Sequence, residues 1–201
     1  TVRYTARGGE FLAGSLYVPL PASPVQVEAE VFPREGGGWD LPSFSWRDGE
    51  VLQASGSARL DADNVPSDLQ LSISLADMAS ARDRYLSGFL APASFGDLVL
   101  TGGVQARLRL VDGQWRSMSL GLERLNAIDP RQRFTLAGLH GNLRWNAGGA
   151  PEAGELAWDS AALFGIGLGN ARLDFTGKDG QLVLREPVAI DALNGQVRLE
   201  H

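Results

Sequence analysis

The run Gly165-Ile-Gly167-Leu-Gly169 resembles a phosphate-binding glycine loop. A dinucleotide site of this kind needs a strand before the run and a helix after it, because the phosphate lies at the N-terminus of that helix. Here residues 171–176 alternate between apolar and polar types, which predicts a strand after the run. We therefore interpret these glycines as a strand entry or a β-bulge.

Carboxylates are numerous enough that a glycosidase-like acid–base pair has to be considered. However, Asp48, Asp112 and Asp179 each precede a glycine, a pair that is typical of tight turns. Glu28 and Glu30 fall on the polar side of an alternating strand. We therefore predict no catalytic residue, and we expect that the protein is not an enzyme.

The chain has no cysteine and two histidines, His140 and His201. This composition removes disulfides, cysteine-based zinc sites, thiol nucleophiles and sites built from several histidines. His140 follows Gly138-Leu139 in an apparent strand and is interpreted as a strand-face or turn residue. Residues 199–201 could be native or the remainder of an affinity tag, so His201 is given no role. We expect neither a metal nor a cofactor.

The chain has 201 residues and a net charge of −6. This charge argues against nucleic acid as a partner, and against a basic patch on anionic lipid, because both need clustered Lys and Arg. No apolar run approaches the length of about 20 residues that a membrane-spanning helix needs, and no signal peptide is visible. The start at Thr1 and the end within a strand lead us to expect a piece of a longer protein.

Alternation with a period of two dominates the chain. Hairpins are predicted at Asp48-Gly49, Asp112-Gly113 and Asp179-Gly180, because an Asp-Gly pair suits the positive φ of tight hairpin turns. Residues 1–20 are predicted as strand, turn and strand with Gly8-Gly9 at the turn. The apolar spacing changes to three and four over residues 76–90, which predicts a helix that Asp77 caps and Pro92 ends.

These patterns predict a mainly β fold, namely a long, curved antiparallel sheet, groove-like or open-barrel-like, with one short helix. We treat residues 1–201 as a single elongated fragment with an N-terminal β segment (1–75), a helix (76–90) and a second β segment (91–201). A helix of 15 residues is only about 22 Å long, so it cannot cover the apolar side of so many strands. Either two sheets cover one another, or one sheet curls and leaves a groove.

Five tryptophans are spread through the predicted strands, at positions 39, 46, 115, 145 and 158. Their large area suits core packing. The alternative is that they line a ligand surface, and the sequence does not separate these two roles.

Residues 76–200 resemble the YdbH-like branch of the AsmA-like proteins of Gram-negative bacteria. The motifs are the Leu-x-Gly-x-Leu-x-Trp rhythm of residues 139–145, the segment 158–164 before a Gly-rich strand, and Leu-x-Gly-x-x-x-Leu at 193–199. The resemblance implies a periplasmic protein that is anchored in the inner membrane, where curved sheets form a groove for phospholipid. It also implies partners among the envelope proteins of the same bridge.

We therefore expect a segment of a periplasmic bridge that carries phospholipid or another acyl-chain lipid along an apolar β-groove. The candidate groove residues are Ala106, Leu108, Leu110, Leu120, Leu122, Leu173, Phe175 and Val197. Two alternatives remain open. One is a structural or adhesive β-sandwich of an envelope protein without a ligand, and the other is a sugar-binding module or carbohydrate-active enzyme.

Overall fold

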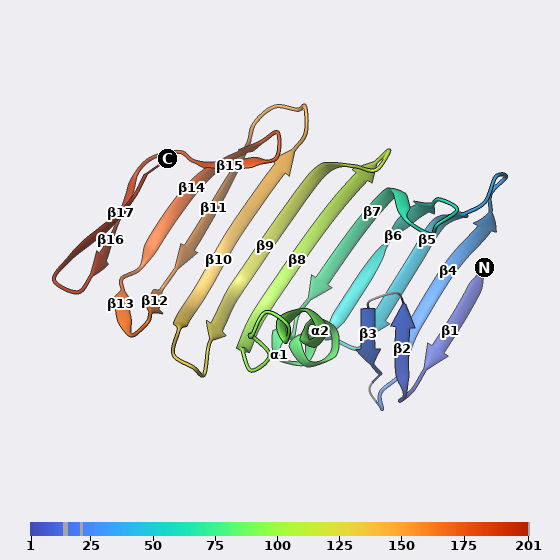
Figure 1. Ribbon diagram of the computed structural model, residues 1–201, viewed down its shortest axis with the longest axis horizontal. Coiled ribbons are helices and arrows are strands. Elements are labelled where there is room, and N and C mark those ends of the chain that lie inside the picture. The colour runs from blue at the N-terminus through green and yellow to red at the C-terminus, as the bar shows by residue number, and fades with distance from the viewer. Residues whose placement is uncertain (14–15, 21, 201) are drawn as a thin grey trace.

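A computed structural model describes residues 1–13, 16–20 and 22–200, and fifteen of its strands form one sheet (Figure 1). All strand pairs in these residues are antiparallel. From β4 onward, neighbours in the sheet are neighbours in the chain as far as β10. The strands of this part are β1 (Val2–Ala6), β4 (Val25–Pro33), β5 (Trp39–Asp48), β6 (Leu52–Leu60), β7 (Pro66–Leu75), β8 (Val99–Val111), β9 (Gln114–Ile128) and β10 (Phe134–Asn146).

The sheet divides at β10, because the two halves of this long strand have different partners. Residues 134–137 pair with β12, and residues 140–142 pair with β11. The two branches come together again where β16 contacts β14. One branch contains β11 (Glu152–Trp158), β14 (Ala171–Lys178) and β15 (Gln181–Leu184), and the other contains β12 (Ser160–Leu163), β13 (Ile166–Leu168), β16 (Val188–Ala192) and β17 (Gly195–Leu199).

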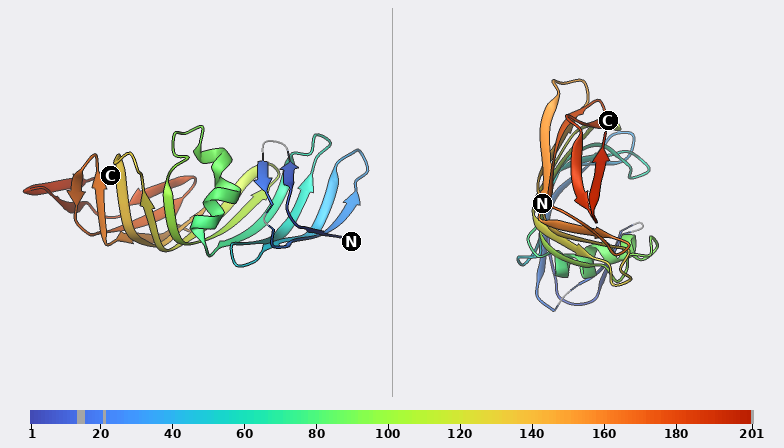
Figure 2. Two further views of the ribbon diagram at one scale, coloured as in Figure 1. Left: turned by 90° about the horizontal axis from the view of Figure 1, so that it is seen from below. Right: turned by 90° about the vertical axis from the view of Figure 1, so that its left-hand side faces the viewer.

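The sheet is curled into a C-shaped trough, as the end-on view of Figure 2 shows. Register shifts in the β4–β5, β5–β6, β8–β9 and β9–β10 pairs mark bulges, which bend strands and increase their twist. Two glycines allow close approach of neighbouring strands. A Cβ atom at Gly56 would lie 1.9 Å from the Gln70 carbonyl oxygen, and one at Gly177 would lie 1.9 Å from the Arg144 carbonyl oxygen.

The helical segment lies over one edge of the trough (Figures 1 and 2). It consists of α1 (Met78–Ala81), a π-helical turn η1 (Arg82–Leu86) and α2 (Ser87–Leu90). The Asp77 carboxylate caps it by accepting hydrogen bonds from the Ala79 and Ser80 amides. Met78 packs with the buried Leu98, Leu100 and Ala127 in a small core beneath the helix, where β8 and β9 lie.

The mainly β fold with one short helical segment, a long curved sheet and an open groove is confirmed. The three Asp-Gly hairpins are also present, as the β5–β6, β8–β9 and β14–β15 connections. The helix was predicted over residues 76–90 and forms over 78–90, although its π-helical turn was not predicted.

The predicted strand, turn at Gly8-Gly9 and strand are present in residues 1–20, but the two strands on either side of this turn do not pair with each other. β1 pairs with β4, while β2 (Glu10–Ala13) and β3 (Leu16–Pro19) form a separate hairpin. Gly8 and Gly9 both have positive φ and turn the chain away from the sheet after Ala6. β1 joins β4 because its apolar residues continue the face on which Val25 is buried.

Little of the apolar surface is sealed in this architecture. The chain exposes 12183 Å², whereas a compact monomer of 21.5 kDa exposes about 9,200 Å². Only ten apolar residues of the described chain are buried. The trough is therefore open, and the helices and the β2–β3 hairpin lie over only part of it.

Close strand approach at Gly56 can be tested with Gly56→Ala, which should lower the free energy of unfolding by about 1–3 kcal/mol. The reason is the clash of the new Cβ with backbone atoms of β7. Urea unfolding measures the change. Gly167→Ala is the matched control, because open space surrounds Gly167. An equally large fall in the free energy of unfolding of this control would contradict the explanation by a backbone clash.

Candidate functional site

The concave face of the sheet is lined by apolar side chains that continue from strand to strand. Directly paired residues lie on the same face of a sheet, so the register identifies them. One row passes through Val27, Trp46, Ala54, Ile73, Ala106, Leu120 and Leu143. A second row passes through Leu52, Leu75, Val104, Leu122, Gly141, Leu156 and Leu173.

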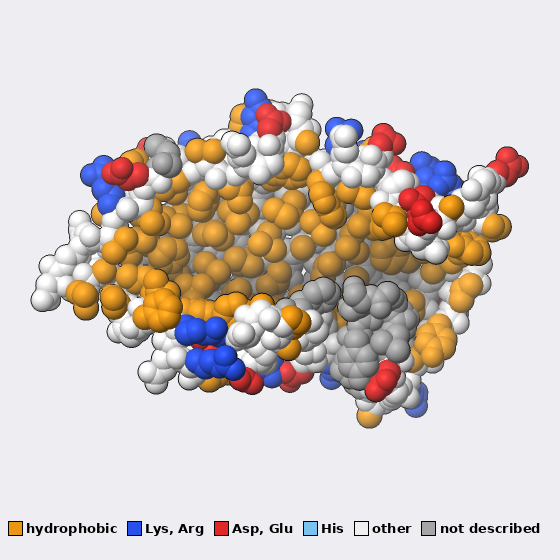
Figure 3. Space-filling model, viewed as in Figure 1, with side chains coloured by type: hydrophobic (Ala, Val, Ile, Leu, Met, Phe, Trp, Pro, Cys, Tyr) orange, Lys and Arg blue, Asp and Glu red, His pale blue; other side chains and the backbone are white. Residues whose placement is uncertain are grey.

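Figure 3 shows this lining as a broad apolar surface within a rim of polar and charged side chains. We call it the groove floor and define it by the two rows above. Its larger side chains are half-buried: Leu120, Leu122, Leu143 and Leu173 all retain some solvent exposure. Contiguous exposed apolar surface is uncommon on soluble monomers, and where it occurs it often accompanies interaction sites or ligand-binding grooves.

The structure places seven of the eight predicted groove residues on this apolar face, in β8, β9 and β14. Ala106 lies opposite Leu120, and Leu122 and Leu173 belong to the second row. Leu108 and Leu110 extend the face along β8, and Phe175 extends it along β14. Val197 lies apart, on the β16–β17 hairpin opposite the buried Ile190.

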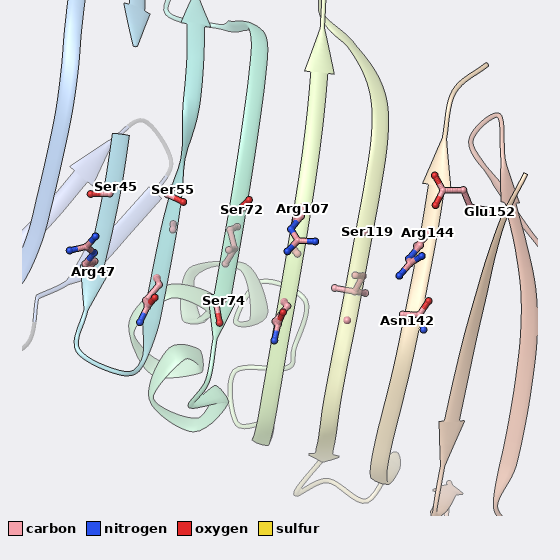
Figure 4. Close-up of a pocket in the computed structure, with 17 residues that line it drawn as sticks. Ser45, Arg47, Ser55, Ser72, Ser74, Arg107, Ser119, Asn142, Arg144 and Glu152 are labelled. Carbon is pink, nitrogen blue, oxygen red and sulfur yellow. The ribbon is translucent and has the colours of Figure 1, made fainter. Parts of the chain in front are cut away.

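The opposite, outer face is polar. Figure 4 shows it from behind the trough, with serines, Asn142 and several arginines around a shallow depression of about 660 Å³. In one row Ser45, Ser55, Ser72, Arg107, Ser119 and Arg144 follow one another across the sheet. These side chains point to solvent and leave the two faces chemically distinct.

Asp48 is a charged residue within the apolar lining. It lies between Val25 and Leu52 on the concave face and is 1% exposed. An Arg84 guanidinium nitrogen lies 2.7 Å from its Oδ2 atom, and the Tyr85 hydroxyl donates a hydrogen bond of 2.8 Å to the same atom. Trp46 in turn donates from its indole nitrogen to the Tyr85 oxygen at 3.0 Å.

This Asp48–Arg84–Tyr85 cluster fastens the π-helical turn to the groove floor. Burial raises the pKa of the Tyr85 phenol, so the hydroxyl stays protonated and donates at physiological pH. Asp48 ends β5 at the β5–β6 turn, as predicted, and it also forms this cluster, which was not predicted. Asp48 and Arg84 are 36 positions apart, and no local pattern in the sequence indicates such a pair.

The tryptophans differ in their surroundings. Trp46 lies on the groove floor under the helix, and Trp145 lies opposite Met118 on the same face. The Trp158 indole donates to the Gly169 carbonyl at 3.0 Å. Trp39 and Trp115 are about half exposed.

The other candidates from the sequence show no catalytic geometry. His140 lies exposed on β10, and its Nδ1 atom is 2.8 Å from the Gly138 carbonyl oxygen. Gly165 is in the β12–β13 turn and Gly167 is in β13, and β14 follows them instead of a helix. Within the described residues, no group of three or more His, Asp or Glu side chains could hold a metal ion.

Comparison of the chain with protein-family models, curated proteins and solved structures found no match. Among the described residues, the helices are too short or too polar to cross a membrane. The argument for function therefore depends on the surfaces described above.

The importance of the cluster can be tested with Arg84→Met, which should lower the free energy of unfolding by about 3 kcal/mol, because it leaves the Asp48 charge buried without a partner. The double variant Asp48→Leu/Arg84→Met should recover most of this loss, since an apolar pair suits the apolar floor.

Urea unfolding of both variants provides the measurement. Arg3→Gln is the control, because Arg3 pairs with Glu28 on the exposed surface and such pairs contribute about 0–1 kcal/mol. If Arg84→Met and Arg3→Gln lowered the free energy of unfolding equally, the cluster would not hold the helix.

Proposed function

We propose that the groove floor binds the acyl chains of phospholipid and that the protein carries lipid along the trough. The observation that supports this proposal is the continuous apolar lining, which the helices and the β2–β3 hairpin leave largely uncovered (Figure 3). Each methylene group removed from water contributes about 0.8 kcal/mol, so an acyl chain needs only continuous apolar surface.

The chemistry of the groove floor suits an acyl chain better than a polar ligand. The two rows of the groove floor contain no charged residue, and Asp48, next to Leu52 at the end of the second row, is already satisfied by Arg84 and Tyr85. A site for a sugar or nucleotide requires several convergent polar groups in a pocket. The described polar depressions lie on the outer side of the strands instead.

The dimensions of the groove also support a path rather than a pocket for one molecule. Eleven strands follow one another from β1 to β10 and on through β11, β14 and β15. Their ten intervals of about 4.8 Å give a length of about 48 Å. One leaflet of a bilayer has a hydrocarbon thickness of about 15 Å, so the groove has room for lipids in series.

The cellular setting of the proposal comes from the sequence motifs. The resemblance to AsmA-like proteins supports a segment of a periplasmic bridge, whose parent protein is anchored in the inner membrane. Phospholipid would be the cargo, and envelope proteins of the same bridge would be the partners.

Leu120→Glu and Leu173→Glu test the acyl site directly. Each should reduce bound phospholipid at least tenfold, because a buried carboxylate beside an acyl chain costs more than about 1.4 kcal/mol. Native mass spectrometry of the purified chain, after incubation with phosphatidylethanolamine vesicles, measures the bound lipid.

Ser119→Glu is the matched control, since Ser119 neighbours Leu120 but lies in the polar row with Arg107 and Arg144. It should leave lipid binding unchanged. A wild-type chain that never carries lipid would overturn the proposal and favour a structural or adhesive module instead.

A further inference from the structure

Two hairpin turns expose large apolar residues at their tips. Phe164 begins the β12–β13 turn and is 73% exposed, and Leu193 begins the β16–β17 turn and is 80% exposed. Both have positive φ, at 49° and 52°. The first residue of a two-residue turn with positive φ is normally Asn, Asp or Gly. In the β8–β9 and β14–β15 turns this first residue is Asp112 and Asp179.

Neither the backbone nor packing within the fold accounts for these two residues. A positive φ disfavours a bulky side chain, and their exposure leaves almost no contact with the rest of the protein. Their side chains therefore suit an apolar environment that the fold itself does not supply.

Both tips lie at the same edge of the sheet, the lower edge in Figure 1. The Phe164 amide donates to the Arg133 carbonyl at 2.7 Å, so the β12–β13 turn lies beside the β9–β10 turn. Leu168 pairs with Ala192 in antiparallel register, which directs the Leu193 tip toward the same edge. Further exposed apolar side chains of this edge are Ile128, Leu163 and Ile166.

We propose that this edge, the apolar rim, contacts a lipid bilayer by inserting Phe164 and Leu193 below the headgroups. Projecting apolar tips suit a fluid surface, into which Phe and Leu side chains insert readily. The exposed guanidinium group of Arg131 belongs to the β9–β10 turn beside the Phe164 tip, and it suits lipid phosphates. The rim also adjoins the open side of the groove, although bilayer contact does not require a lipid in the groove.

The charges of the rim predict how it binds. The Arg131 guanidinium lies 3.7 Å from the Asp97 carboxylate, so the rim has little excess positive charge. The whole chain carries −6. Insertion therefore drives the contact, and binding should be insensitive to salt and should not need anionic lipid.

The experiment is flotation of the whole chain with phosphatidylcholine vesicles at low and high salt. The wild type should float with the vesicles under both conditions. Phe164→Asn/Leu193→Asn should reduce the bound fraction at least tenfold without loss of melting temperature, because asparagine tolerates positive φ. Leu120→Glu should still float, which separates failure of this inference from failure of the acyl site.

Val65→Asn is the matched control and should float like the wild type. Val65 is 56% exposed in the β6–β7 turn, which lies beside the β8–β9 turn at the opposite edge. Flotation of the double variant at the wild-type level would overturn the proposal. Failure of the wild type to float would also overturn it. So would the finding that these tips contact only a second copy of the chain or another protein.

Discussion

The structure depends on one constraint, the agreement between side-chain alternation and hydrogen-bonded register. Because side chains alternate with a period of two, a shift of one residue in any strand pair would move apolar residues to the outer face. The register keeps Ile73, Ala106 and Leu120 together on one face, and Ser72, Arg107 and Ser119 together on the other. The groove floor therefore depends on the register of many strand pairs, and no single residue creates it.

Curvature converts this two-sided sheet into a trough. A flatter sheet with one apolar face would pair with a second sheet and seal that face. Here bulges in several strand pairs bend the strands, and the sheet curls around its apolar side. The Asp48–Arg84 pair then holds the helix at one edge, so that the helix narrows the opening without filling it.

The sequence allows prediction of the features that depend on neighbouring residues. Alternation indicates the strands, Asp112-Gly113 and Asp179-Gly180 indicate two-residue turns, and Asp77 indicates the start of the helix. The eight candidate groove residues were predicted in the same way, and the register places seven of them, all except Val197, on the apolar face of β8, β9 and β14.

Other features follow from contacts between distant segments and have no local pattern. The pairing of β1 with β4, the division of the sheet at β10 and the Asp48–Arg84 pair are of this kind. The exposed tips at Phe164 and Leu193 were missed for another reason. The turn there contains a residue type that turn statistics disfavour, and its exposure is visible only in the structure.

Photo-crosslinking at two adjacent residues tests the central claim most directly. A benzophenone side chain at position 143 would lie on the groove floor opposite Leu120, and one at position 144 would lie on the outer face opposite Ser119. After illumination with radiolabelled phosphatidylethanolamine, we expect labelled protein from position 143 and almost none from position 144. Equal labelling at both positions, or none at position 143, would contradict an acyl-binding groove.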